Sequence, residues 1–316
     1  MMPANLGVIV TLFCLMLIGF LLGWRKVIGQ EGTDSLARLI STVAIPAATG
    51  YQGLMLDTAG LASETFWGIG TALLAMVITL LVGMGFARVL RIPPPERKGL
   101  FAVHFSMANT IFVGLPVVEA FYGPAALPYV IYYFIGNTVM AWSIGSFLIQ
   151  RDGVRLRGES VRFRLRDLRR IFSPPLLAFL LGLAVNLSGL MLPSFFTETV
   201  AYLSRMATPL AMVYTGILIY HGGRESFRPQ KGLSAVLAGR FLISPLIMLA
   251  IAHLGGLPVL MRNVFVMEAA MPAMAQAVVI AGTYGADKQY AASVLSFTLI
   301  VNMVTAPLWV WGLSMI

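Results

Sequence analysis

The sequence has few charged residues and almost no cysteine. Charged residues make up 11% of the 316 positions, and Cys14 is the only cysteine. A single cysteine excludes an intramolecular disulfide framework, and its place in an apolar run argues against a metal site. Because 58% of the residues are hydrophobic, a chain of this length cannot bury its apolar surface as a soluble domain.

The sequence motifs of common enzyme classes are also missing. There is no HExxH zinc motif, no phosphate-binding P-loop and no Gly-x-Ser-x-Gly nucleophile elbow. We therefore expect no enzymatic activity, no cofactor and no bound metal. Without a nucleotide site, any uphill transport must draw on an ion gradient.

What the sequence does contain is a series of long apolar segments. They predict an all-α polytopic membrane protein, because each segment, at roughly 18 to 25 residues, is long enough to cross a bilayer. The first segment has no basic region before it, so we predict a retained helix and not a cleaved signal peptide. The ten predicted helices cover 4–24, 35–56, 64–90, 99–122, 126–150, 173–192, 197–221, 232–254, 263–284 and 288–314.

The basic residues lie mainly in alternate loops between these segments. With the N-terminus outside, 18 of the 22 Lys and Arg residues fall in cytoplasmic loops, so both termini are predicted to be extracytoplasmic. Although the net charge is +9, this placement argues against nucleic acid as a partner. The basic segment 151–172 is predicted to be a cytoplasmic linker and topology anchor, with binding of anionic membrane lipids as the alternative.

The two halves, 1–150 and 173–316, resemble each other. Pro46 and Pro209 are 163 residues apart, Tyr122 and Tyr284 are 162 apart, and Asn137 and Asn302, the next such pair, are 165 apart. These similar intervals predict a duplicated unit of five helices. Because five is an odd number, the second copy enters the membrane from the opposite side, as in the inverted repeats of secondary transporters.

One helix in each half is predicted to be broken. The segment 99–122 contains Asn109, Gly114 and Pro116, and a proline inside a helix removes a hydrogen bond, so we predict a break between Asn109 and Pro116. Pro272 lies in the equivalent part of 263–284. Such breaks are tolerated within protein or beside a watery cavity, where the helix N-terminus offers N–H donors to an anion.

The residues near these breaks are candidates for binding an anionic substrate. Amides and hydroxyls can orient a carboxylate without the desolvation cost of a buried charge, although they can also simply bond neighbouring helices. Pro46 and Pro209 are predicted to be hinges or kinks. The candidate substrate-binding residues are Asn109, Thr110, Gly114, Pro116, Asn137, Pro272 and Gln276.

Ionisable residues inside the predicted spans are few, and each is a candidate for function. Glu268 lies about one turn before Pro272, and Arg240 lies well inside 232–254, so these two are candidates for ion coupling. His104 and Glu119 flank the break in 99–122. For Glu119, a position near the end of a helix is the alternative.

Several segments resemble the auxin efflux carrier family, which includes plant PIN-FORMED proteins and bacterial malonate transporters. The resemblance covers essentially the whole chain, and NTIFVGLP is its most specific part. The segments are GWRK (23–26), VAIP (43–46), NTIFVGLP (109–116) followed by YG (122–123), RFLISP (240–245) and AAMP (269–272).

This resemblance implies a fold and a mode of action. It implies two inverted five-helix repeats with crossing helices 4 and 9, a scaffold of helices 1, 2, 6 and 7, and a transport domain of helices 3–5 and 8–10. It further implies an elevator-like movement, a homodimer formed through the scaffold, and contact of Asn109 and Asn137 with a carboxylate. The short central loop matches bacterial members, and Glu268 replaces an amide of plant sequences, which together argue against auxin as the substrate.

We therefore expect a secondary transporter of the bacterial inner membrane. Its substrate would be a small organic anion, malonate-like or malate-like, and its coupling ion a proton in preference to sodium. One alternative is a sodium-coupled or cation-exchanging carrier of a related inverted-repeat fold. The other is a membrane sensor that binds the anion without moving it.

Overall fold

The apolar segments fold into helices in a computed structural model that describes residues 2–56, 61–92, 97–156, 174–221 and 230–316. Within these ranges there is no strand, and one isolated antiparallel bridge joins Ala108 to Ala273. The prediction of an all-α protein is therefore confirmed for the described residues. Most of the basic linker predicted at 151–172 lies outside them, as do parts of the other basic loops.

The chain divides into two compact units. Unit 1 comprises Met1–Trp67, Ile111–Ile131 and Phe172–His221, and unit 2 comprises Gly68–Thr110, Tyr132–Ile171 and Gly222–Ile316. Helices α4 (Leu61–Val89) and α7 (Leu127–Met140) begin in unit 1 and continue into unit 2.

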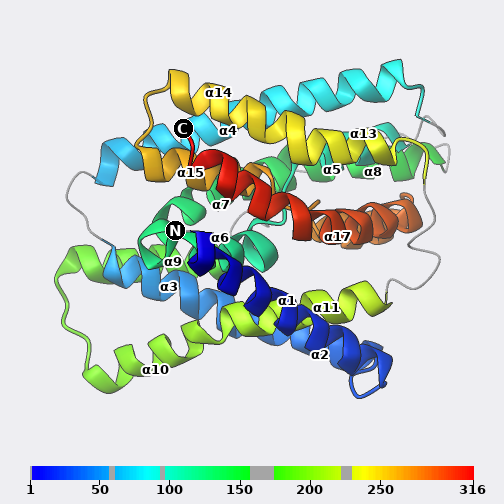
Figure 1. Ribbon diagram of the computed structural model, residues 1–316. Coiled ribbons are helices and arrows are strands. Elements are labelled where there is room, and N and C mark those ends of the chain that lie inside the picture. Colours follow the sequence, from blue (N-terminus) through cyan, green and yellow to red (C-terminus); the bar gives the residue numbers. More distant parts are fainter. Residues whose placement is uncertain (1, 57–60, 93–96, 157–173, 222–229) are drawn as a thin grey trace. The chain divides into compact units, whose positions relative to one another are not determined.

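The other helices belong to one unit each (Figure 1). Unit 1 contains α1 (Met2–Trp24), α2 (Gln30–Leu39), η1 (Ile40–Ala44), α3 (Ile45–Met55), α6 (Leu115–Tyr122), η4 (Pro124–Ala126), α9 (Pro174–Ser188), α10 (Ser194–Arg205) and α11 (Ala207–His221). Unit 2 contains α5 (Lys98–Ser106), η5 (Ala141–Gly145), α8 (Ser146–Leu156), α13 (Leu233–Ala238), η7 (Gly239–Ile243), α14 (Ser244–Leu254), α15 (Val259–Ala269), α16 (Gln276–Tyr284) and α17 (Lys288–Leu313). The π-helical turn η3 (Thr110–Gly114) spans the boundary.

Unit 1 is built on two helix pairs in close backbone contact, α1 with α11 and α3 with α9. A Cβ atom at Gly216 would collide with the carbonyl of Met16, and one at Gly182 would collide with the carbonyl of Gly50. Helices in membranes pack closely where small residues face each other, because lipid offers no hydrophobic force to press them together. These glycines therefore allow the two pairs to form.

The packing glycines of unit 1 repeat at a fixed interval. Gly19 of α1 and Gly182 of α9 are 163 residues apart, and so are Gly53 of α3 and Gly216 of α11. A Cβ atom at any of the four positions would meet backbone atoms of the paired helix. This interval is the one that separates Pro46 from Pro209 in the sequence.

Three prolines each lie two residues after the end of a π-helical turn. Pro46 comes after η1, Pro116 after η3 and Pro245 after η7, and each lies in the first turn of the α-helix that continues the segment. Proline is tolerated in a first turn because its missing N–H group has no partner to lose there. The π-helical turn changes the register of the ladder just before each proline.

The predicted spans are more interrupted than the sequence indicates. Three described helical segments are long and apolar enough to cross a membrane: Thr65–Val89, Leu233–Leu254 and Lys288–Leu313. The predicted span 35–56 is divided into α2, η1 and α3, and the span 263–284 contains most of α15 and all of α16. The arrangement of ten helices in two repeats remains a prediction.

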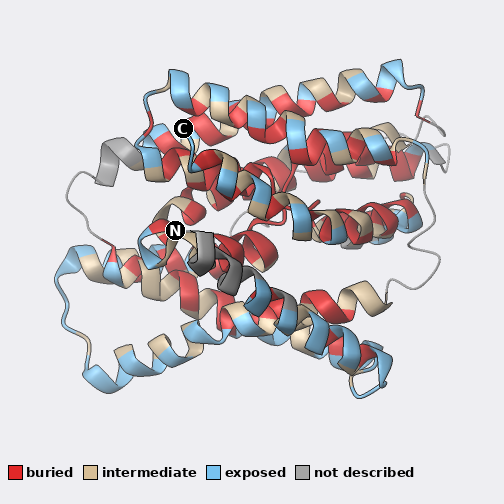
Figure 2. Ribbon diagram, in the orientation of Figure 1, coloured by how far each residue is buried: buried red, intermediate tan, exposed pale blue. Residues whose placement is uncertain are grey.

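Exposed residues, pale blue in Figure 2, occur on several helices, and many of them are large and apolar. Helix α10 has no buried residue, and Phe195 and Tyr202 on it are 70% and 68% exposed. On α9, Leu181 is 68% exposed. Such apolar surface is unfavourable in water, and it is accommodated when the helices face lipid.

Candidate functional site

Two interrupted helical segments meet in unit 2. Helix α5 ends at Ser106, and Met107 at its C-cap is extended, with φ −100° and ψ 131°. Helix α15 ends at Ala269, and the next α-helix, α16, begins at Gln276. The N–H groups of Met107 and Ala270 still donate to Val103 and Val266, but the backbone that follows each of them leaves the α-helical ladder, so its polar groups need other partners.

The two non-helical stretches pair with each other. At the Ala108–Ala273 bridge, the backbone N–H of Asn109 donates to the carbonyl of Pro272 at 2.8 Å, and that of Met274 donates to Met107 at 3.2 Å. The bridged residues Ala108 and Ala273 are 165 positions apart. The same interval separates Asn137 from Asn302.

The break in the first segment lies earlier than predicted. We expected it between Asn109 and Pro116, but the chain leaves the α-helix at Met107 and re-enters a helical path at Thr110. Pro116 lies in the first turn of α6, where a proline fits without breaking a helix. The bridge decides the position, because it supplies the partners that the backbone at 107–109 needs. Asn109 and Thr110 belong to unit 2, whereas Gly114 and Pro116 belong to unit 1.

We call the place where the two non-helical stretches pair the crossing. Asn137 on α7 binds the first of these stretches, 107–109. Its Oδ1 accepts a hydrogen bond from the backbone N–H of Ala108 at 3.2 Å, and its Nδ2 donates to the carbonyl of Ala108 at 3.0 Å. On the other stretch, the Oγ1 of Thr298 accepts from the N–H of Ala273 at 3.1 Å. The Asn137 amide thus satisfies the backbone of Ala108 and has one N–H and one lone pair beyond these two bonds.

Two other amides near the crossing remain open. Among the described residues, the side chains of Asn109 and Gln276 form no hydrogen bond with another residue. Asn109 is 4% exposed, and Gln276 is the first residue of α16 and is half-buried. Asn302 on α17 is also buried, and its Oδ1 has no partner within the described ranges. These amides are the groups at the crossing that could bind a ligand.

Arg240 is completely buried and binds the carbonyl ends of both broken helices. Its Nη2 donates to Ala269 at 2.7 Å and its Nε donates to Met271 at 3.2 Å, both at the end of α15. Its Nη1 donates to the carbonyl of Phe105 at 3.4 Å, at the end of α5. A positive charge at two helix C-termini compensates both dipoles and satisfies carbonyls that the breaks leave free.

Glu268 lies beside this arginine but is not bonded to it. The carboxylate is 0% exposed, and neither oxygen has a hydrogen-bond partner among the described residues. Arg240 is within electrostatic reach of Glu268, of Tyr133 on α7 and of His104 on α5. The two sequence candidates for ion coupling are therefore neighbours at the crossing.

The sequence pattern does not indicate Thr298, Tyr133 or Tyr290 as site residues. Thr298 lies one helical turn before Asn302, so it shares a helix face with a residue that the repeat had marked, and this spacing could have identified it. Pro46 in α3 and Pro209 in α11 belong to unit 1, and their role as hinges remains a prediction.

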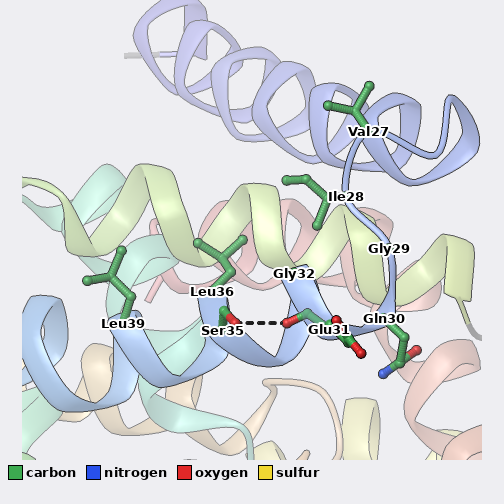
Figure 3. A pocket seen from close by; sticks show the side chains of 9 residues that line it. All are labelled: Val27, Ile28, Gly29, Gln30, Glu31, Gly32, Ser35, Leu36 and Leu39. Carbon is green, nitrogen blue, oxygen red and sulfur yellow. Dashed lines mark hydrogen bonds between the residues drawn. The ribbon is translucent and has the colours of Figure 1, made fainter.

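A separate pocket lies in unit 1, at the turn between α1 and α2 (Figure 3). Its volume is about 760 Å³, and it contains none of the residues predicted for the site. The Ser35 hydroxyl in its wall donates to the carbonyl of Glu31 at 2.9 Å. The lining residues are Val27, Ile28, Gly29, Gln30, Glu31, Gly32, Ser35, Leu36 and Leu39.

Comparison with known proteins gives consistent matches over the whole chain. Residues 6–310 match a protein family described as membrane transport protein. A protein of Methanothermobacter thermautotrophicus, named an uncharacterized transporter, is 31% identical over 310 residues, covering 95% of this chain and 96% of that protein. Another, from Methanocaldococcus jannaschii and also named an uncharacterized transporter, is 23% identical over 316 residues, covering 98% and 99% of the two chains.

Proposed function

We propose that the protein carries a small organic carboxylate across the membrane, because the chain belongs to the membrane transport protein family. This is the same family as the auxin efflux carriers that its sequence resembles. The substrate that we propose is of the malonate or malate type, and the coupling ion is a proton. The protein is then a secondary transporter that works by alternating access.

The observation that carries this proposal is the pairing of two broken helices at Ala108 and Ala273. A carboxylate only accepts hydrogen bonds, so its site must supply N–H or O–H donors. The free amides of Asn109 and Gln276 are such donors, and the N-terminus of α16 adds backbone N–H groups and a favourable dipole.

The division into units supports an elevator-like movement. Unit 2 contains most of the helices expected to form the transport domain, together with the crossing, and unit 1 contains those expected to form the scaffold. In the proposed cycle, unit 2 moves with its bound anion while unit 1 stays fixed. The chain passes between the units at Thr110 and Ile111, so the second half of the first broken segment groups with the scaffold.

The recurring intervals support the proposal of two inverted repeats. The packing glycines of unit 1 recur after 163 residues, and the bridging residues of unit 2 recur after 165. When the two copies of a repeat enter the membrane from opposite sides, their equivalent broken helices meet in antiparallel directions. The Ala108–Ala273 bridge is antiparallel, as that arrangement requires.

Glu268 is the residue through which we propose proton coupling. A charged carboxylate that is fully buried without a hydrogen-bond partner is costly, and uptake of a proton removes that cost. Arg240, which is held on the helix ends, compensates the carboxylate charge once the proton leaves. The substrate and the proton would then occupy neighbouring positions at one crossing.

An uptake assay with the Asn109→Ala variant tests the proposed site. We expect the variant to reach the membrane in normal amounts but to lose uptake of labelled malonate or malate, because it lacks an amide donor at the crossing. The matched control is Asn263→Ala, which removes an amide of unit 2 that binds the side chain of Arg262 and lies away from the bridge. Normal uptake by Asn109→Ala would remove that residue from the site.

A further inference from the structure

A row of polar side chains runs through unit 2 and is not used by the anion site. We call it the polar row, and its members are Arg97, Asp287, Tyr290, His104, Arg240 and Glu268. All six belong to unit 2, so their arrangement does not depend on where unit 1 lies.

The outer end of the row is an ion pair near the start of α17. The Nη2 of Arg97 lies 2.5 Å from the Oδ2 of Asp287, and the two side chains are 22% and 21% exposed. Asp287 also caps the helix, since its Oδ1 accepts from the backbone N–H of Tyr290 at 2.8 Å. The guanidinium carbon of Arg97 lies 5.4 Å from the centre of the Tyr290 ring. This end is partly accessible to solvent, and it lies next to the basic residues Lys98 and Lys288 of the predicted cytoplasmic loops.

The middle of the row is completely buried and unpaired. Tyr290 and His104 are both 0% exposed, and their ring centres lie 6.3 Å apart in an edge-to-face arrangement. Within the described ranges, neither the Tyr290 hydroxyl nor either ring nitrogen of His104 has a hydrogen-bond partner. A phenylalanine at each position would fill the space without leaving a polar group unpaired. Packing alone therefore does not account for the hydroxyl and the imidazole.

The inner end of the row reaches the crossing. Arg240 donates to the carbonyl of Phe105, the residue after His104, and to the carbonyl of Ala269, the residue after Glu268, so its guanidinium joins the two backbone positions. Asp152 on α8 also faces α5, and its Oδ2 accepts from the backbone N–H of Leu100 at the opposite end of that helix. Exchangeable groups are thus placed from the partly exposed ion pair to the buried carboxylate.

We infer that the polar row is a proton path that connects the membrane face bearing Arg97 and Asp287 with Glu268. The inference rests on the proposed proton-coupled transport and names the route that it requires. Chains of acidic, histidine and hydroxyl groups inside a membrane protein are how protons cross apolar regions. One bridging water, or rotation of the rings, joins groups that are more than a hydrogen bond apart.

Each step of the path leaves the net charge of the relaying group unchanged, and rotation of the hydroxyl and a flip of the imidazole ring restore the starting orientation before the next proton. The Tyr290 hydroxyl receives a proton on its oxygen and releases its own toward His104. The imidazole takes that proton on its unprotonated nitrogen and gives up the proton of the other nitrogen. Glu268 is the terminal acceptor and becomes a neutral carboxyl group, while Arg240 keeps its charge throughout.

The test separates proton movement from substrate movement in proteoliposomes. Counterflow of labelled malonate or malate, whichever the wild type exchanges, reports the anion site, and a pH-sensitive dye reports proton entry during net uptake. The variants are His104→Phe and Tyr290→Phe, which keep the rings and delete the exchangeable groups. Ser106→Ala is the control, because it removes a buried hydroxyl of the same helix that bonds only to Ala102.

We expect both variants to keep counterflow and to lose proton entry, by roughly a hundredfold for His104→Phe, while Ser106→Ala keeps both. If His104→Phe lacks counterflow through misfolding, His104→Gln, which is polar but does not titrate near neutral pH, must show the same loss of proton entry. Wild-type proton entry in these variants, or uptake by the wild type without proton movement, would overturn the path. Absence of wild-type counterflow would instead refute the proposed transport.

Discussion

At the scale of single residues, a few side chains allow helices to end within the membrane protein. Asn137 binds both backbone groups of Ala108, and Arg240 binds carbonyls at the ends of α5 and α15. Each unpaired backbone group in an apolar interior would cost several kcal/mol, so a break without such partners would be unstable. The polar residues of the crossing therefore serve the backbone before they serve a ligand.

Asp152 on α8 is a buried acid that lies outside the predicted spans and binds the backbone at the start of α5. Its Oδ2 accepts from the N–H of Leu100 at 2.8 Å, and the side chain is 1% exposed. Burial raises the pKa of its carboxyl from 3.8 to about 7, although backbone hydrogen bonds, Arg151 and Arg155 act in the opposite direction. A raised pKa in the folded state means that the folded chain holds a proton that the unfolded chain releases.

This difference predicts a pH-dependent effect of Asp152→Asn on stability. Between about pH 4 and pH 7 the unfolded state binds fewer protons, so the contribution of Asp152 to stability falls as pH rises. The amide keeps an acceptor for Leu100 without the charge, so the melting temperature of the purified variant should exceed that of the wild type at pH 8. The gain should disappear at pH 4, where the carboxyl is protonated.

The exposed carboxylate of Glu198 on α10 provides the control for this measurement. Glu198→Gln should leave the difference in melting temperature between pH 4 and pH 8 the same as in the wild type. A gain for Asp152→Asn that is equal at both pH values would show that charge at this position does not limit stability.

At the scale of elements, helix pairs in unit 1 are set by glycine and not by large apolar side chains. The backbone of α11 at Gly216 lies against the carbonyl of Met16 on α1, and α3 and α9 meet in the same way at Gly53 and Gly182. In lipid, this close packing replaces the hydrophobic force that pairs helices in water. The large apolar residues of these helices are free to face the lipid.

Gly216→Ala should destabilise the α1–α11 pair. The added methyl group meets the backbone of Met16, which cannot rotate away, and overpacking of this kind costs about 1–3 kcal/mol. Thermal unfolding in detergent should therefore show a lower midpoint. The matched control is Gly70→Ala on α4, where nothing lies within 4 Å of the added atom, and where alanine favours the helix by about 0.5–1 kcal/mol. Equal midpoints for the two variants would contradict this account of the pair.

At the scale of the whole molecule, the bridged helix breaks and the buried polar residues around them fall in one unit. The crossing, the amides open to a ligand and the polar row all belong to unit 2. Unit 1 holds its helices together by backbone contacts and a few polar bonds, such as that from Thr208 to the Oε2 of Glu119 at 2.7 Å. This separation is what a carrier needs if one part binds while the other stays in place.

A ligand that binds the crossing should raise the stability of the purified protein. At a malonate concentration of about 100 times Kd, binding raises the free energy of unfolding by about 2.7 kcal/mol. Each kcal/mol corresponds to a rise of about 2–4 °C in the melting temperature. Asn109→Ala should melt near the wild type without ligand and lose most of the shift. Acetate, with one carboxylate, is the comparison for a site built for a dicarboxylate.

The outcomes of this screen distinguish the classes of function. A shift with malonate but no counterflow in proteoliposomes would favour a sensor over a carrier. No shift with any small carboxylate would contradict the proposed anion site.

The sequence by itself determined that the chain is helical and lies in a membrane, that it belongs to a transporter family, and that Pro272 lies in an interruption. These properties depend on composition, on the lengths of apolar runs and on local backbone chemistry. Only the tertiary structure decided that the first break lies at 107–109, that Asn137 and Arg240 bind the broken ends, and that His104 faces Tyr290. The reason is that each of these features needs a partner remote in the chain: Arg240 and Phe105 are 135 residues apart, and their contact exists only after the helices have packed.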